Sequence, residues 1–206
     1  FGITYPLLLT SSGQKFGKTE GGAVWLDPKR TSPYKFYQFW VNAEDRDVER
    51  LLRLFTFLPL EEIRDIAARH GAAPERREAQ KILAEEITRT VHGEKALAGA
   101  VRATEILFGG KFDLEDLTPD MLATLEAEVP GGEAPRDERS VVELLVASGA
   151  CASKGEAKRL IQGGGDSLNG RKVESDAATV EPDEILFGSY LFFRLGKRRF
   201  HMVRAR

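Results

Sequence analysis

The stretch Lys15-Phe16-Gly17-Lys18-Thr19, followed by Glu20-Gly21-Gly22-Ala23-Val24-Trp25-Leu26-Asp27, determines how the N-terminal part of this 206-residue chain can fold. Two lysines flank a glycine and precede a hydroxyl residue, which suits a loop that places positive charge on a polyphosphate. In a P-loop, however, G-x-x-x-x-G-K-[ST] leads directly into a helix. Here Gly13 and Gly17 enclose only three residues, and the residues after Thr19 predict a second turn and a short strand. The sequence excludes a P-loop and leaves two interpretations: a phosphate-handling loop or an ordinary solvated turn.

The composition fits one or two packed domains, since 42% of the residues are hydrophobic and the formal net charge is only −2. The charge is unevenly distributed along the chain. Acidic residues predominate between Asp113 and Glu138, whereas Gly188 to Arg206 contains basic residues and no acidic one. This asymmetry predicts a C-terminal surface for an anionic partner, with a solvated basic tail as the alternative.

The cysteine content and hydropathy indicate the compartment. Cys151 is the only cysteine, so an intrachain disulfide is impossible and a reducing compartment fits. Because no apolar run approaches transmembrane length and no signal peptide is visible, we expect a cytoplasmic protein without membrane partners. The chain begins with Phe1 and enters a strand-like segment at once, so we expect it to be cut from something longer.

The first two-thirds of the chain predict the end of an α/β unit and then a helical domain. Residues 1–30 read as strand, loop and strand. Ser32 can cap a helix that has Pro33 at its first position, and Asn42 is a candidate cap for the next helix. Further helices are expected at 59–70, 74–92, 94–108 and 118–128, which complete a helical domain over 31–129.

The remainder predicts a linker and a small α+β domain. Residues 130–139 are rich in Pro and Gly, carry charge and lack apolar periodicity, which is typical of a linker. In 140–206, capping boxes at Ser140 and Ser153 start two helices, and Gly163-Gly164-Gly165 ends the second. Asn169-Gly170 predicts a tight turn between short strands. Further strands are expected at 186–187, 190–195 and 200–203.

Three segments resemble bacterial tyrosyl-tRNA synthetase: Pro6-Leu7-Leu8-Leu9, Trp25-Leu26-Asp27 and Thr31-Ser32-Pro33-Tyr34-Lys35-Phe36-Tyr37-Gln38-Phe39-Trp40-Val41-Asn42. In this class I family, Lys-Phe-Gly-Lys-Thr is the form taken by the second signature motif. The resemblance extends from Phe1 to Arg206. It implies the C-terminal portion of a tyrosine–tRNA ligase, with an α-helical anticodon-binding domain and an α+β RNA-binding domain after the end of the catalytic domain.

The resemblance also implies roles for the lysine loop. Lys18 would contact ATP, Lys15 would contact the pyrophosphate, and Thr19 would donate from its hydroxyl group. ATP is the implied substrate, accompanied by Mg²⁺, and the intact enzyme would dimerise through a segment absent here. The chain has no His-x-Gly-His signature and no tyrosine pocket, so we expect it to be inactive alone. The rival hypothesis is a free-standing RNA-binding or regulatory protein derived from a synthetase.

Val141 to Val173 resembles a small RNA-binding fold shared by a ribosomal protein and several RNA-modifying enzymes. Ser153-Lys154-Gly155-Glu156-Ala157-Lys158-Arg159-Leu160-Ile161 and Asn169-Gly170-Arg171 carry this likeness. Asp166, where the fold usually has an apolar residue, and the three consecutive glycines depart from the pattern. The implied ligand is tyrosine tRNA, and its expected contacts are Lys154, Lys158, Arg159, Arg171, Arg194, Lys197, Arg198 and Arg199, with Arg204 as a further backbone contact.

Other candidate groups have competing interpretations. The aromatic cluster Tyr34, Phe36, Tyr37, Phe39 and Trp40 is expected to be core rather than a base-stacking platform, and to join the lysine loop to the helical domain. The acidic residues at 44, 45 and 47 are either helix-capping groups or acceptors for anticodon bases. The three histidines show no metal-ligand spacing, and Cys151 is expected to be a buried small residue rather than a nucleophile.

Overall fold

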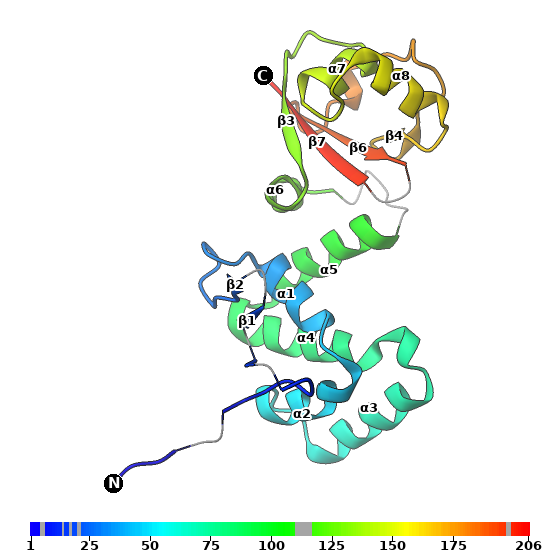
Figure 1. Cartoon of the computed structure of the whole chain (residues 1–206). Coiled ribbons are helices and arrows are strands. Elements are labelled where there is room, and N and C mark those ends of the chain that lie inside the picture. The colour runs from blue at the N-terminus through cyan, green and yellow to red at the C-terminus, as the bar shows by residue number, and fades with distance from the viewer. Residues whose placement is uncertain (5–6, 14, 17, 20–21, 110–116, 197–198) are drawn as a thin grey trace. The chain divides into compact units, whose positions relative to one another are not determined.

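The computed structural model describes all residues of the chain except 5–6, 14, 17, 20–21, 110–116 and 197–198 (Figure 1). Its contacts divide the chain into two compact units, residues 1–101 and residues 102–206. This division differs from the boundary at residue 129 that the sequence suggested. The fold is a mixture of helices and one five-stranded sheet, as predicted for an α+β protein.

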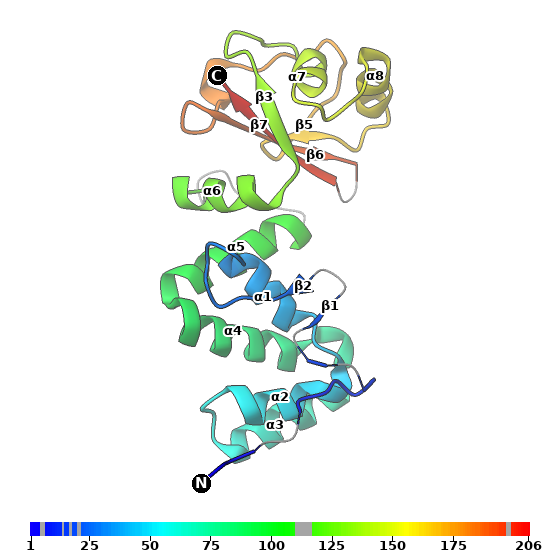
Figure 2. The same cartoon turned by 60° about the vertical axis from the view of Figure 1, so that its left-hand side comes forward.

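The N-terminal unit is a small hairpin followed by helices. The hairpin pairs β1 (Lys18–Thr19) with β2 (Gly22–Ala23) in antiparallel fashion. The helices are α1 (Pro33–Val41), α2 (Asp45–Phe55), α3 (Leu60–Ala72), the short 3₁₀ turn η1 (Pro74–Arg76), α4 (Glu78–His92) and α5 (Glu94–Gly109), which continues past residue 101. Helix α4 packs on α1, α2 and α3 (Figure 2). Several leucine and isoleucine side chains of these helices are buried.

The helix starts agree only partly with the sequence patterns. The Ser32 hydroxyl accepts a hydrogen bond from the Lys35 amide and Pro33 opens α1, as predicted. Asn42 is not the cap of α2, because it ends α1 and Glu44 occupies the cap position without a side-chain bond. The helix expected at 74–92 is interrupted at Arg77, whose φ of 52° lies in the left-handed region.

The C-terminal unit is a five-stranded sheet with helices on both faces. Its elements are α6 (Pro119–Glu128), β3 (Gly131–Ala134), α7 (Val141–Ala147), α8 (Lys154–Gln162), β4 (Ser167–Leu168), β5 (Arg171–Lys172), the 3₁₀ turn η3 (Pro182–Glu184), β6 (Tyr190–Leu195) and β7 (Arg199–Ala205). The strand order is β3-β7-β6-β4-β5, and only β3 is parallel to its neighbour.

Alternation along β6 and β7 explains how both faces are covered. Leu191, Phe193 and Val203 belong to the core beneath α7 and α8. The intervening residues face the other side, where α6 lies (Figures 1 and 2). There Glu126 of α6 accepts a hydrogen bond from the Tyr190 hydroxyl at 3.0 Å. Helix α6, which the sequence places in the helical domain, therefore packs with the sheet.

The segment expected to be a linker contains an edge strand. Gly131 to Ala134 pair in register with Met202 to Ala205. A Cβ atom on Gly132 would lie 2.1 Å from the Ser148 carbonyl oxygen, and one on Gly131 would lie 2.7 Å from that of Met202. These glycines permit close backbone approach, so their presence reflects packing and not a flexible connection.

The turns show one confirmed prediction and one error. Asn169 and Gly170 have φ values of 48° and 82° and connect β4 to β5, as their sequence predicts. Of residues 186–187, expected as a strand, Leu186 forms an isolated antiparallel bridge with Tyr190, and Phe187 lies in a tight turn with a φ of 48°. Two consecutive apolar residues, Leu186 and Phe187, favour a strand in the sequence, and this pattern does not reveal the turn.

The two predicted capping boxes are only half formed. The hydroxyl groups of Ser140 and Ser153 accept bonds from the Glu143 and Glu156 amides, as expected. The reciprocal bonds differ, because the Ser140 amide donates to Glu138 and the Glu156 carboxylate accepts from the Ala152 amide.

Among the helices of the described residues, none is long and apolar enough to cross a bilayer.

Candidate functional site

The lysine loop enters a hairpin, and Lys18 and Thr19, expected in the turn between two strands, themselves form the first strand of that hairpin. Lys18 pairs with Ala23 and Thr19 pairs with Gly22 across the two strands. The side chains of Lys18 and Thr19 lie outside the described atoms, as does Gly17 entirely. Lys15 is exposed and its backbone bridges to Leu9. The chain therefore reaches β1 through a short antiparallel bridge and not through a helix.

Phe16, between the bridge and β1, anchors the loop to the helices. Its ring centroid lies 5.6 Å from that of Phe39, 5.6 Å from that of Trp40 and 5.9 Å from that of Phe55. Phe36 and Trp40 are buried, so the aromatic cluster is core and not an open stacking platform, as predicted. The apolar contacts of Phe16 join the lysine loop to α1 and α2.

The acidic start of α2 holds the segment that precedes the loop. The Ser11 amide donates to Asp47 Oδ2 at 2.9 Å, and the Ser11 hydroxyl donates to Glu44 Oε2 at 3.0 Å. Arg50 donates to the Leu9 carbonyl oxygen. Asp47 is only 4% exposed, so it is committed to this internal contact and is not available to a base.

A shallow pocket of about 410 Å³ opens beside the same helix start, lined by Asn42, Ala43, Glu44, Asp45, Arg46 and Arg77. Asp45 Oδ1 accepts from Gln80 Nε2 at 2.5 Å and lies 3.1 Å from His70 Nε2. Arg77 donates to the Val41 and Ala43 carbonyl oxygens at 2.8 and 3.2 Å. Carboxylates, amides and a guanidinium thus surround a space that suits a planar polar group.

Three of the predicted cations of the C-terminal unit are paired with carboxylates. Lys154 Nζ lies 2.5 Å from Glu143 Oε1, and Lys158 Nζ lies 3.3 Å from Asp176 Oδ2. Arg171 pairs with Glu184 at 2.6 Å. The hydrogen bond to Glu143 raises the pKa of Lys154. Protein carboxylates therefore already compensate much of this basic surface.

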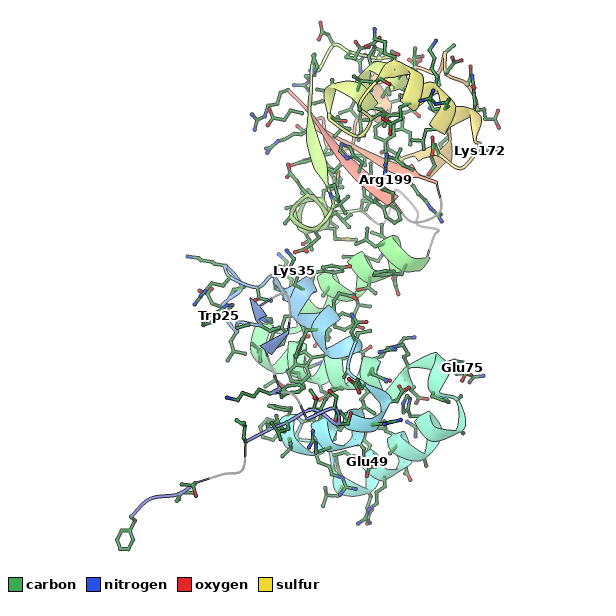
Figure 3. All side chains as sticks on the ribbon, in the orientation of Figure 1. Trp25, Lys35, Glu49, Glu75, Lys172 and Arg199 are labelled. Carbon is green, nitrogen blue, oxygen red and sulfur yellow. The ribbon has the colours of Figure 1, made fainter. Side chains whose placement is uncertain are left out.

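The other predicted cations that the structure describes lie on different elements: Arg159 on α8, Arg194 on β6 and Arg199 on β7. Arg199, labelled in Figure 3 with Lys172, is exposed and donates to the Ala150 carbonyl oxygen at 2.9 Å. Arg194 belongs to the opposite sheet face, with its guanidinium 6.0 Å from the Phe200 ring centroid. Lys197 and Arg198 lie outside the described residues. Arg159 is exposed, and within the described part of the chain no ion pair engages its side chain.

Asp166 shows why this module departs from its usual pattern. Its Oδ1 accepts a hydrogen bond from the Gly196 amide at 2.8 Å, and burial raises the pKa of its carboxyl group. A Cβ atom on Gly165 would lie 3.1 Å from the Gly196 Cα. Gly165 and Asp166 together hold Gly196, the residue after β6, against the segment that follows α8.

The remaining reactive side chains have structural roles. Cys151 is buried and burial raises the pKa of its thiol, which disfavours the thiolate form. His201 Nε2 lies 3.1 Å from the Ser148 hydroxyl oxygen in the core. Within the residues that the structure describes, no group of three or more His, Cys, Asp or Glu side chains is placed to hold a metal ion.

The sequence analysis did not single out Phe187 or Arg136 as candidate functional residues. Phe187 is 54% exposed and adopts a left-handed backbone conformation. The Arg136 side chain lies beside Gly188, the residue after Phe187. The available signal was the Phe187-Gly188 pair just before a strand, because a glycine at this place permits a tight turn.

Comparison with known proteins gives a consistent picture along the chain. Residues 1–109 match the family described as tRNA synthetases class I (W and Y), and residues 121–203 match the tyrosine–tRNA ligase SYY-like C-terminal domain. The chain is 50% identical over 208 residues to a tyrosine–tRNA ligase of Anaeromyxobacter dehalogenans, covering 100% of this chain and 49% of that protein. It is 45% identical to tyrosine–tRNA ligase 2 of Bacillus cereus, covering 99% of this chain and 48% of that protein.

Solved structures with similarity include a C-terminally truncated mitochondrial tyrosyl-tRNA synthetase of Coccidioides posadasii. That similarity has a TM-score of 0.42 with 42% sequence identity, and it covers 49% of this chain and 26% of the other. The chain thus spans about half the length of the curated relatives it matches.

Proposed function

The chain belongs to the family of class I tRNA synthetases (W and Y), and on that premise we propose that the intact protein is a tyrosine–tRNA ligase. It would activate tyrosine with ATP, accompanied by Mg²⁺, and transfer tyrosyl to its tRNA. The observation that carries the proposal is the order of the two family matches, because a tyrosine-specific C-terminal domain follows the part common to tryptophan and tyrosine enzymes.

In this proposal the hairpin supplies positive charge to the departing pyrophosphate. Activation passes through a pentacoordinate phosphorus, and negative charge moves onto the leaving group. Lys18 and Lys15 would meet that charge as it develops, which stabilises the transition state more than bound ATP. Thr19 would add a hydroxyl donor. The Phe16 contacts support this role, because they fix the base of the loop while the lysine stems stay long and adaptable.

Pyrophosphate exchange by the intact protein tests the role of Lys18. We expect Lys18→Ala to lower the exchange rate by about 10²–10³ and to change ATP affinity much less. Lys29→Ala is the matched control, because Lys29 is an exposed lysine in the next turn of the same segment. An exchange rate in Lys18→Ala equal to that of the control would reject the proposal for this residue.

We propose that the C-terminal unit binds the tyrosine tRNA, using Lys154, Lys158, Arg159 and Arg171 for phosphates. Lys197, Arg198, Arg194 and Arg199 would extend these contacts. The exposed positions of Lys154 and Lys158 on α8 support this, since phosphate-binding cations lie beside a core and not inside it. Lys154→Ala and Lys158→Ala should each weaken tRNA binding and reduce its salt slope by up to about one unit. Unchanged slopes would remove these lysines from the interface.

We further propose that the intact enzyme works as a cytoplasmic homodimer whose contacts lie outside this chain. The 206-residue chain alone should bind tRNA without catalysing exchange, because the signature motif and tyrosine pocket of the family are not recognisable in it. Exchange activity in the isolated chain would contradict this division of labour. Sedimentation of the intact protein and of this chain, compared at equal concentrations, tests the dimer.

A further inference from the structure

Phe187 occupies a backbone position that phenylalanine normally avoids. The Ser189 amide donates to the Leu186 carbonyl oxygen at 3.1 Å, and the two central residues, Phe187 and Gly188, have φ values of 48° and 70°. Two positive φ angles define a type I′ turn, which strongly prefers Asn-Gly. A bulky residue in the left-handed region is strained, and such strain is often found at functional positions.

The same unit contains a second turn of this type for comparison. Asn169 and Gly170 have φ values of 48° and 82°, so the preferred residue is present there. Asn169 is buried and its side chain makes two internal bonds, to the Glu184 carbonyl oxygen at 2.6 Å and from the Phe192 amide at 2.9 Å. The fold therefore uses the favoured residue where the side chain has a structural task.

Phe187 has no comparable task inside the described chain. Its side chain is 54% exposed, and none of the ring–ring contacts found among the described residues includes it. More than half of this residue is thus left open to an external contact. An external contact would explain why a large aromatic ring is kept at this place.

The neighbouring charge indicates what kind of contact this is. Arg136 Nη2 lies 3.6 Å from the point where a Cβ atom on Gly188 would sit, and Arg136 is exposed. Lys154, Lys158 and Arg171 each face a carboxylate. Considering only residues that the structure describes, Arg136 has no such partner. An aromatic face beside an uncompensated guanidinium is typical of sites that bind unpaired nucleotides.

We propose that Phe187 stacks on an unpaired base of the bound tRNA while Arg136 neutralises an adjoining phosphate. This inference rests on the proposed tRNA-binding function and adds a specific contact to it. The strained turn comes directly before β6, and the Arg136 guanidinium lies beside its second central residue, Gly188. Stacking depends little on salt, whereas the arginine contact releases counterions.

The test measures tRNA affinity and melting temperature of the full 206-residue chain. A transcript of the tyrosine tRNA is the probe, and an unrelated RNA hairpin is the reference. Phe187→Asn, which copies the Asn169 turn, should raise the melting temperature and weaken tRNA binding by about tenfold without changing the salt slope. Phe187→Trp should keep the affinity. Arg136→Ala should weaken binding and reduce the slope by about one unit.

A matched control is Phe57→Asn, because Phe57 is a 92% exposed phenylalanine in the other unit and should leave the affinity unchanged. Unchanged affinity of Phe187→Asn, with wild-type binding intact, would overturn the stacking role and leave the proposed function standing. Full affinity in Phe187→Leu would equally overturn it, since leucine has no ring to stack. Unchanged affinity together with altered self-association would assign the turn to a protein contact and reject the inference. A wild-type chain that prefers the tRNA no more than the hairpin would refute the proposed function itself.

Discussion

Asp166 is a carboxylate placed in the core of the C-terminal unit, where a charge is costly. Burial raises the pKa of this group, although the Gly196 amide and the more distant Arg199 charge oppose the rise. The folded state therefore holds the proton more tightly than the unfolded state. The protonated group therefore contributes to the free energy of unfolding at acid pH. This contribution is lost as the pH rises from the ordinary carboxyl pKa through the raised one.

Because the raised pKa of Asp166 means that its ionised form destabilises the fold, removing this charge should stabilise the protein at neutral pH. Asp166→Asn keeps an oxygen that can accept from Gly196 and removes the buried charge, so the variant should be more stable than wild type near pH 7. The difference should shrink towards pH 4, where the wild-type carboxyl group binds its proton. Urea unfolding at a series of pH values measures this. A difference that stays constant across the series would show that the charge is not the cause.

At the scale of the element, β3 joins the sheet through two glycines that accept very close neighbours. Gly132→Ala would place a Cβ atom 2.1 Å from the Ser148 carbonyl oxygen, which is backbone and cannot turn away. We expect a loss of about 3 kcal/mol in unfolding free energy. Gly155→Ala is the control, because its Cβ would have only Ser153 Oγ as a neighbour, at 3.9 Å. The control should be neutral or up to about 1 kcal/mol more stable.

If Gly132→Ala unfolds at the same urea concentration as the control, the close packing of β3 on the turn after α7 is refuted. Circular dichroism of both variants before unfolding shows whether the sheet itself is retained.

The ion pairs of α8 predict that neutralising their carboxylates changes tRNA binding. Glu143 and Asp176 pair with Lys154 and Lys158, so in the proposed tRNA complex they would compete with RNA phosphates for these lysines. Glu143→Gln and Asp176→Asn should therefore each tighten tRNA binding about two- to fivefold, because exposed ion pairs are weak. The salt slope should steepen, since solution ions would replace the lost carboxylates. Filter binding at several salt concentrations measures both changes, and weaker binding of either variant would contradict the competition.

Element by element, local signals were readable from the sequence and close tertiary approach was not. Ser32 with Pro33, and Asn169 with Gly170, act within a few residues, so their cap and turn were predicted correctly. Gly131 and Gly132 were misread as a linker, because the partners that require them, Met202 and Ser148, lie elsewhere in the sequence.

The candidate site divides in the same way. The short strand expected after Thr19 is present as β2, because its signal is local. The carboxylates that face Lys154, Lys158 and Arg171 were not, because ion pairs depend on which elements meet in space. Phe187 was assigned to a strand, since its apolar side chain hides a left-handed backbone.

At the scale of the whole molecule, the C-terminal unit has its own core of buried side chains from both helices and sheet. We predict that residues 117–206 form a stable domain when expressed alone, because Leu117 and α6 already belong to this unit. Thermal unfolding followed by circular dichroism should show one cooperative transition. A broad, non-cooperative melt would mean that the unit needs the preceding helices to fold.

The position of β7 has a consequence for proteolysis. This strand lies between β3 and β6, so one short segment supplies the hydrogen bonds on both of its sides. A protease that cleaved the chain after Gly196 would remove the strand that pairs with β3. It would also remove Arg204, which forms an ion pair with Glu126. Removing residues 197–206 would thus take out a central strand of the sheet and not an edge strand.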